Sequence, residues 1–467
     1  MLRWFGASLD DLQSPAEAAP FLSFWKDRSK GFSSPPQADW REGGQPVHPV
    51  SAASAVALST SAPAAKTAAT LAPSSSAASS AVAKLSDAGI AADVAKNLQN
   101  GALSYSSVLT ILKDAATGGV TAAEFGALQT FASELNATGG IKVSTYVQQI
   151  ADDVILGNSA NATWNGGAAT ATALGNLHAG SSQAQANELI GTWFLGSNLP
   201  SLNLSSVGES SLGATYQTSS LPLYGASGAP AWQDVNQGYV GDCYFLSSLG
   251  EVALKDPSAI ESMITDNGNG AYGVRFFVNG KADYVTVDSE LPVMGGGYRW
   301  ANGSPLEFAN GTSDKWVGLV EKAYAELNAQ TSAPHGMTLN TASDSYAGIT
   351  GGTGAALTLI TGQSESAYAL QSSTPASTLS SILSTISSAF NAGEEVLMST
   401  SSASSGNLVG SHMYMITGLD KASGALSVHN PWNTAYSGSL AMNFTESIQQ
   451  LAAANCTLWV TSGQPSV

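Results

Sequence analysis

The sequence predicts an α+β domain of two lobes in its second half, preceded by a small all-α module and a disordered N-terminal tract. Three observations lead to this prediction. Residues 48–80 consist almost entirely of Ala, Ser, Pro, Val and Thr, residues 82–200 repeat a helical pattern, and aromatic residues and strand patterns become dense from residue 228 onward. Helices followed by a run of strands are typical of α+β domains.

The N-terminal tract, residues 1–81, is expected to be mostly disordered. Small and polar side chains bury too little surface to offset the entropy lost when the chain is ordered. The first residues, MLRWFGASLDDLQSP, lack the apolar core and the cleavage site of a secretory signal. We therefore expect a soluble protein that is cytoplasmic or is exported without a signal peptide.

The charge balance argues against two classes of partner. The chain has 17 Lys and Arg against 34 Asp and Glu, which gives a net charge of -17. Such an acidic protein is not expected to bind nucleic acid, because binding needs basic side chains that displace counterions. Adhesion to anionic membranes is not expected for the same reason. No uninterrupted apolar stretch reaches the length of about 18 residues that a membrane-spanning helix needs.

Residues 82–200 are expected to form the helical module, with residues 201–227 as a linker to the second half. The segments combine a Ser, Thr or Asp start, an apolar repeat and a Gly or Asn stop, which is typical of capped amphipathic helices. The expected helices lie at 86–101, 104–119, 121–140, 143–158 and 185–195. Such a module is a candidate pro-segment that occupies or supports a cleft, and the tract at 48–80 is a candidate cleavage site.

The second half, residues 228–463, combines helices and strands. A strand pattern on each side of Asn279–Gly280 predicts a hairpin, because Asn-Gly is a preferred two-residue turn. Apolar residues at helical spacing predict a helix over 315–329. A glycine-rich loop at 345–354, a helix at 379–393 and strands at 394–400, 412–420 and 425–432 complete the pattern.

Cys243 lies in the stretch NQGYVGDCYFLSSLG and is one of only two cysteines in the chain. Asp242 is suited to cap a helix that begins at Cys243. The thiol would then lie where the partial positive charge of a helix N-terminus stabilises a thiolate. The local sequence leaves three interpretations open: a nucleophile, a packed thiol, or one end of a disulfide with Cys456. A nucleophilic thiolate needs a histidine base and a group that orients the base.

Two of the five histidines, His412 and His429, lie in strand patterns of the second half. Because side chains alternate along a strand, Asn430 is expected to face His412 while His429 points to the surface. Trp432 is placed to cover the His–Asn pair. Gln237 precedes the cysteine by six residues and is able to donate an amide N–H to a developing oxyanion.

Taken in order, the motifs of the second half resemble those of the calpain family of cysteine proteases. They are Q-G-x-x-G-D-C-[WY]-[FL]-L, VTVDSELP, W-x-x-L-x-E-K-A-Y-A-x-L-N, S-x-x-x-I-T-G-G, H-x-Y-x-I-T-G and N-P-W. The resemblance covers residues 228–463 and implies a papain-like two-lobed calpain catalytic core. The helical Cys lobe would span 228–345 and the β-rich His/Asn lobe would span 346–463.

The resemblance also implies roles for individual residues. Cys243 would be the nucleophile and His412 the base. Asn430 would orient His412, and Gln237 would donate a hydrogen bond to the oxyanion. Trp432 would shield the His–Asn bond from water. Gly351 and Gly352 would border a groove that binds extended peptide.

Several positions depart from the family pattern. Tyr244 stands where the family usually has Trp. Ser411 stands where the family usually has Gly, and its side chain would narrow the substrate groove. Asp234 and Asp314 partly match the calcium ligands of the first lobe, with surface carboxylates as the alternative. The second lobe lacks the expected acidic residue, Tyr436 being closest, and no penta-EF-hand region is found. We expect no required cofactor and at most one calcium site.

These observations favour a calpain-like cysteine endopeptidase that cleaves proteins by acyl transfer through a thiolate. The expected partners are protein or peptide substrates and the chain's own N-terminal region, as an inhibitor or as a substrate of autoprocessing. Two alternatives remain. One is a catalytically inactive calpain-fold module with a binding or regulatory role. The other is a transglutaminase-type acyl transferase, against which Asn430, in place of Asp, argues.

Overall fold

The computed structural model describes residues 76–208, 214–238, 240–294, 297–298, 314–330, 344–352, 354–402, 405–420, 422–432 and 440–462. The chain divides into two compact units, residues 1–73 and 74–467, and the elements below belong to the second. Most of the tract that was expected to be disordered lies outside the described residues. Its last residues are part of a helix, α2 (Ser76–Val82).

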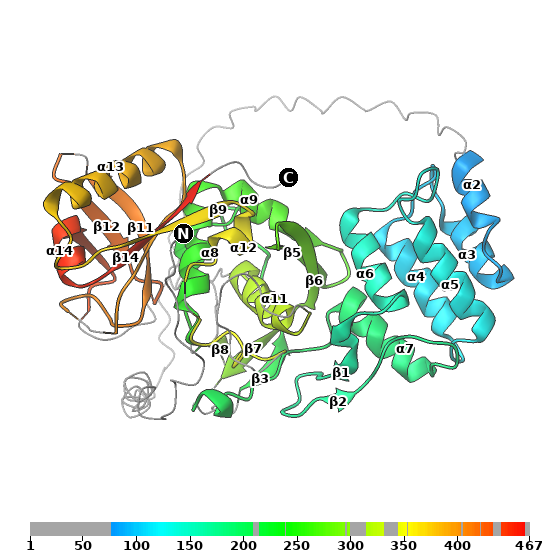
Figure 1. Ribbon diagram of the computed structural model, residues 1–467. Helices are drawn as coiled ribbons and strands as arrows, with labels where there is room; N and C mark the ends of the chain where they lie inside the picture. The colour runs from blue at the N-terminus through cyan, green and yellow to red at the C-terminus, as the bar shows by residue number, and fades with distance from the viewer. Residues whose placement is uncertain are drawn as a thin grey trace, which may run out of the picture. The chain divides into compact units, whose positions relative to one another are not determined.

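The helical unit, residues 76–200, contains the five predicted helical segments (Figure 1). Polar side chains fix where its helices begin, as in the reciprocal pair of hydrogen bonds between Thr121 and Glu124. A short two-stranded sheet of β1 (Thr163–Trp164) and β2 (Thr172–Ala173) is also present. The remaining helical elements are α3 (Ala88–Asn97), α4 (Tyr105–Ala116), α5 (Ala122–Glu134), α6 (Thr145–Ile155), α7 (Gln183–Ile190) and the π-helical turn η2 (Gly191–Leu195).

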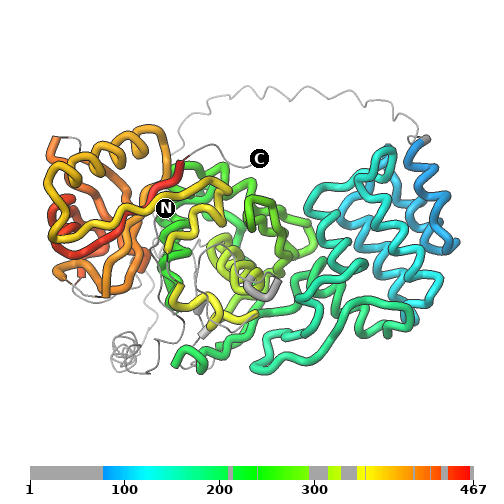
Figure 2. The backbone as a smooth tube through the Cα atoms, viewed as in Figure 1, coloured from blue at the N-terminus to red at the C-terminus, as the bar shows by residue number. Residues whose placement is uncertain are grey.

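The stretch at 201–227, expected as a linker, contributes to the fold of the second half. Its strand β3 (Thr215–Thr218) pairs with β7 (Glu290–Met294), which also pairs with β8 (Gly297–Tyr298). Leu202 and Leu204 are buried in the same apolar core as α8 (Cys243–Lys255). The composition of this stretch indicated a connector, but two apolar side chains and one strand are enough to attach it. Figure 2 follows this passage from the helical unit into the green part of the chain.

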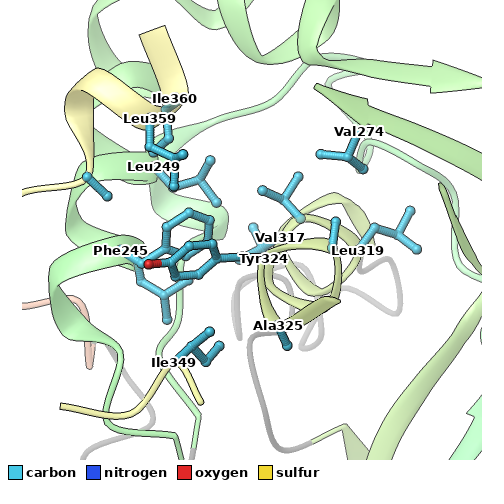
Figure 3. Packing of buried hydrophobic residues seen from close by; sticks show 14 of the residues in the cluster. Phe245, Leu249, Val274, Val317, Leu319, Tyr324, Ala325, Ile349, Leu359 and Ile360 are labelled. Carbon is cyan, nitrogen blue, oxygen red and sulfur yellow. The ribbon is translucent and has the colours of Figure 1, made fainter. Parts of the chain in front are cut away.

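The cysteine-bearing part of the second half contains a three-stranded sheet with the order β4-β5-β6, together with helices that include α8. β5 (Ala271–Val278) and β6 (Lys281–Asp288) form the predicted hairpin, with positive φ at both Asn279 and Gly280. The other elements are α9 (Pro257–Met263), β4 (Ile264–Asp266), α11 (Trp316–Gln330) and α12 (Leu357–Thr361). Figure 3 shows how Phe245 of α8 packs against Tyr324 of α11, with ring centroids 4.0 Å apart.

The histidine-bearing part is a six-stranded antiparallel sheet with the order β13-β12-β11-β10-β14-β9. Its two faces bury different partners, because successive side chains point to opposite sides of a strand. Tyr414 and Ile416 pack in a core with α13 (Ala376–Ala392) and α14 (Ile448–Ala453), whereas Met413 and Met415 pack in the core that contains α8. The strands are β9 (Ser364–Ala369), β10 (Val396–Ser399), β11 (Met413–Asp420), β12 (Ala425–His429), β13 (Asn443–Ser447) and β14 (Thr457–Ser462).

Within the described ranges, no helix combines the length and the apolar character that crossing a bilayer requires.

Candidate active site

Cys243 is the first residue of α8, as the sequence predicts, but Asp242 does not cap this helix. The Asp242 side chain is completely buried and interacts with Glu321 of α11. Burial raises the pKa of Asp242 to about 8, so this carboxyl group is protonated at neutral pH. The predicted cap is therefore wrong, because the side chain points toward α11 and away from the free N–H groups of α8.

The thiol of Cys243 is neutral in this structure, and not the stabilised thiolate that a helix N-terminus predicts. Removal from water raises its pKa to about 12, and the backbone N–H of Met413 opposes this rise only in part by hydrogen-bonding to the sulfur. The contact with Met413 is informative for another reason. Met413 follows His412 directly, so the sheet brings the predicted base next to the thiol-bearing helix.

His412 and Asn430 are hydrogen-bonded, with 2.9 Å between Nε2 of the imidazole and Oδ1 of the amide. The Asn430 Oδ1 atom also accepts the backbone N–H of Trp432 at 3.0 Å. Because that oxygen accepts from both sides, Nε2 of His412 carries the proton and Nδ1 keeps a free lone pair. The bond therefore selects the imidazole tautomer that is able to act as a base at Nδ1.

The surroundings of His412 are aromatic, and its side chain is buried. The indole of Trp432 lies 4.8 Å from the imidazole, centroid to centroid, and the ring of Tyr414 meets it edge-on at the same distance. The backbone is fixed by Thr400, whose Oγ1 accepts the His412 N–H at 3.0 Å. Burial lowers the pKa of His412 to about 4, although its bond to Asn430 favours the charged form.

His429 does not point to the surface, so that prediction is wrong. Its side chain is buried, meets the ring of Trp232 edge-on at 4.8 Å, and has Nδ1 within 2.8 Å of Asn443 Oδ1. The strand alternation was correct, since Asn430 faces His412 and His429 faces the other way. However, the other face of the sheet is covered by the cysteine-bearing part, including the short helix η4 (Trp232–Asp234).

Gln237 connects the segment that bears Cys243 with the segment that bears Asn430. Its backbone N–H donates to the Pro431 carbonyl at 2.8 Å, which ties the loop before Cys243 to the residue after Asn430. Its side chain is buried, and Nε2 donates to the Val240 carbonyl at 2.7 Å. An amide NH₂ group has two protons, so one remains available for a substrate oxygen.

The two predicted groove glycines lie next to the cysteine loop. The Gly351 N–H donates to the Gly241 carbonyl at 3.0 Å, two residues before Cys243. At Gly352 an added Cβ would lie 2.3 Å from the ring of Tyr244, so a larger residue would displace that aromatic ring. Tyr244 itself is buried and donates its hydroxyl to the Ile349 carbonyl at 2.9 Å.

Ser411, which stands where glycine is usual in the resembling family, has a φ of 51°. A left-handed backbone costs a residue with a side chain about 1 kcal/mol or more, whereas glycine adopts it freely. Ser411 is only partly buried and donates its N–H to the Ser401 carbonyl. The backbone conformation therefore explains why glycine suits this position.

Asp234 and Asp314 are both buried, so the alternative that they are surface carboxylates is wrong. Oδ2 of Asp234 accepts the indole N–H of Trp316 at 2.9 Å and the backbone N–H of Ala231 at 2.8 Å. Across the described parts of the chain, no three His, Cys, Asp or Glu side chains gather in a way that could hold a metal ion. Tyr436 lies outside the described residues.

Cys243 and Cys456 are both free thiols, so the disulfide interpretation is wrong. Cys456 is buried in the core of the six-stranded sheet. His178 hydrogen-bonds to Ser181 within the helical unit, whereas His48 and His335 lie outside the described residues.

A thiol at a helix N-terminus, beside a hydrogen-bonded His–Asn pair on an adjoining sheet, is an arrangement typical of cysteine peptidases. Residues 220–451 match the calpain family of cysteine proteases, and this part of the chain belongs to that family.

Several calpains are similar to part of this chain. Calpain-13 of Rattus norvegicus is 26% identical over 224 residues, which cover 44% of this chain and 30% of the relative. Calpain-2 catalytic subunit of Gallus gallus is 26% identical over 232 residues, covering 46% and 29%. Calpain-type cysteine protease DEK1 of Arabidopsis thaliana is 34% identical over 139 residues, covering 28% and 6%. The matched region thus spans less than a third of each of these relatives.

Proposed function

We propose that this chain is a calpain-like cysteine endopeptidase that cleaves protein substrates by acyl transfer through Cys243. The observation that carries the proposal is the 2.9 Å bond between His412 Nε2 and Asn430 Oδ1, which leaves Nδ1 of the imidazole free as a base. The same strand, β11, presents the Met413 N–H to the Cys243 sulfur. A nucleophile, a base and an orienting amide are the parts that thiol-dependent acyl transfer needs.

The reaction begins from a neutral thiol and a neutral imidazole. Nδ1 of His412 takes the thiol proton as the sulfur attacks the scissile carbonyl carbon, and a carbon–sulfur bond forms. The carbon–nitrogen bond then breaks, and the imidazolium returns its proton to the leaving amine. Water, deprotonated by the same nitrogen, cleaves the thioester and restores the Cys243 thiol.

The oxyanion of the tetrahedral intermediate needs two donors. We assign them to the backbone N–H of Cys243 and to the second Nε2 proton of Gln237. The hydrogen bond from Gln237 to the Pro431 carbonyl supports this assignment, because it fixes the donor relative to the His–Asn pair.

The architecture we propose is papain-like. Residues 228–345 would form the Cys lobe and residues 346–463 the His/Asn lobe, with an extended peptide bound between Gly351, Gly352 and Ser411. Trp432, whose ring lies 4.8 Å from that of His412, would keep water from the His–Asn bond. Calcium at Asp234 and Asp314 would be optional, and autoprocessing would occur within residues 48–80.

The test compares Cys243→Ala with Cys456→Ala, which removes the other thiol. Each protein is incubated with an unfolded protein substrate and, separately, with a thiol-reactive peptide probe. We expect Cys243→Ala to abolish turnover and labelling, whereas Cys456→Ala keeps both. Equal turnover in the wild type and in Cys243→Ala would refute the proposal.

The same experiment separates the two alternatives. A catalytically inactive binding module would bind the substrate without releasing peptides in the wild type as well. A transglutaminase-type transferase would incorporate an added amine faster than it hydrolyses the peptide.

A further inference from the structure

The helical unit packs directly against the cysteine-bearing part, and some backbone atoms of the two are in van der Waals contact. An added Cβ at Gly196 would lie 2.2 Å from the Val287 backbone in β6, so the two backbones touch. At Gly273 in β5 an added Cβ would lie 2.5 Å from the ring of Tyr146. The Tyr146 hydroxyl is in turn 2.8 Å from Thr286 Oγ1. Such close approach is typical of a fused interior and not of a segment that is built to dissociate.

A second contact reaches the loop at 344–352 through buried polar groups. The Asn165 side-chain amide donates to the Asp344 carbonyl at 2.8 Å, and the Ser201 N–H donates to the same carbonyl at 2.9 Å. Ser345 Oγ donates to the Ser201 carbonyl at 3.2 Å. We name this group the polar clamp; its members are all buried, and they are Asn165, Asn198, Ser201, Asp344 and Ser345.

The clamp fixes an unusual backbone conformation. Asp344 has a φ of 50°, in the left-handed region that few residues other than glycine adopt. Its carboxyl group lies against the side-chain amides of Asn165 and Asn198. Asn198 Oδ1 in turn accepts the backbone N–H of Asn165 at 2.7 Å. The helical unit thus supplies the bonds that hold the beginning of the loop in this conformation.

The far end of the same loop supports the cysteine. The Gly351 N–H donates to the Gly241 carbonyl, and the Ile349 carbonyl accepts the Tyr244 hydroxyl, so the loop contacts the chain on both sides of Cys243. Figure 3 shows Ile349 beside the pair formed by Phe245 and Tyr324. The loop is thus anchored at one end by the clamp and at the other end by the segment around Cys243. A shift of the loop at the clamp would therefore move the segment around Cys243.

We propose that Asn165 is a positioning residue for the active site, acting through the polar clamp on the loop at 344–352. The helical unit is then a permanent part of the active enzyme and not a pro-segment that is released. This inference rests on the proposed peptidase function. It also limits autoprocessing: a cut within 48–80 leaves the clamp intact, whereas a cut between residues 165 and 201 breaks it.

The test uses the full chain with Asn165→Ala, the milder Ser345→Ala, and Asn161→Ala as the matched control. Asn161 is as well buried, but among the described residues its side chain bonds within the helical unit, to Asp153, Asn176 and Trp193. A lost hydrogen bond of about 1–2 kcal/mol speeds local opening roughly 5- to 30-fold. We expect that acceleration in amide hydrogen exchange of 344–352 for the two clamp variants but not for the control.

Kinetics give a second readout that simple loss of folded protein would not produce. When the competent loop is only partly populated, saturating substrate selects it, so KM rises by about threefold or more while kcat stays near the wild-type value. Loss of folded enzyme would instead lower kcat at unchanged KM. If Asn165→Ala fails to fold, Ser345→Ala gives the same readouts.

Two results would overturn the inference. One is unchanged exchange in 344–352 for the clamp variants, and the other is an equal effect of Asn161→Ala. A wild type without turnover would refute the proposed function instead. The clamp would then be judged by exchange and by the rate at which iodoacetamide labels Cys243, which we expect the clamp variants to change and Asn161→Ala to leave alone.

Discussion

The burial of His412 predicts a specific pH dependence of stability. Burial lowers its pKa from 6.5 to about 4 in the folded protein, whereas in the unfolded chain it returns to its ordinary value. As the pH falls below 6.5, the unfolded state binds the proton first, so the folded state loses relative stability down to about pH 4. Above 6.5 the imidazole is neutral in both states, and the stability it contributes is fully present.

The size of the effect follows from the two pKa values. At about 1.4 kcal/mol per pKa unit, a fall from 6.5 to about 4 corresponds to roughly 3 kcal/mol of unfolding free energy. The assay is urea unfolding between pH 4.5 and 7.5 for the wild type and for His412→Gln, which keeps a donor for Asn430 without a titrating ring. His429, whose pKa burial also lowers, is present in both proteins and cancels in the difference.

We expect the free-energy difference between wild type and His412→Gln to shift in favour of the wild type as the pH rises to 6.5. Parallel pH profiles for the two proteins would refute the argument from burial. If His412 is the base as proposed, the same pKa predicts that the acid limb of kcat/KM falls near pH 4 and not near 6.5, because Nδ1 loses its lone pair only when His412 is protonated.

Three further predictions concern stability and are measured by urea unfolding. Ser411→Gly should stabilise the protein by up to about 1 kcal/mol, because it relieves a left-handed backbone; a loss of stability would contradict this. Gly196→Ala should destabilise it by about 3 kcal/mol or more, since the new Cβ meets the β6 backbone, whereas Gly180→Ala, with open space around its Cβ, should cost about 1 kcal/mol. His429→Ala should cost about 3 kcal/mol by emptying the space beside Trp232, and His429→Phe should cost less; equal losses would show that the ring contact is unimportant.

Local chemistry made several features predictable from the sequence. A polar cap marks the start of the helix at Ala122–Glu134, and Asn279–Gly280 marks the hairpin, because both signals act over a few residues. Strand alternation likewise placed Asn430 toward His412, since the side-chain period of two holds in any sheet.

The features that the sequence did not reveal depend on what packs against each element. His429 is buried because the cysteine-bearing part covers the second face of the sheet, and no pattern within the strand reports that second layer. The Asp242 side chain does not cap the helix because it interacts with Glu321, which lies far along the chain. The expected linker contains the strand β3 for the same reason, because β7 supplies its hydrogen-bonding partner.

The sequence by itself identified the candidate residues for the proposed chemistry: a cysteine at a helix start, a histidine at a strand start and an asparagine on the facing side of the next strand. Only the tertiary structure decided their protonation. Burial holds Cys243 as a neutral thiol and His412 as a neutral imidazole, because a charge loses its hydration when protein replaces water around it. It also decided that the helical unit reaches the cysteine loop, through bonds between residues such as Asn165 and Asp344 that lie far apart in the chain.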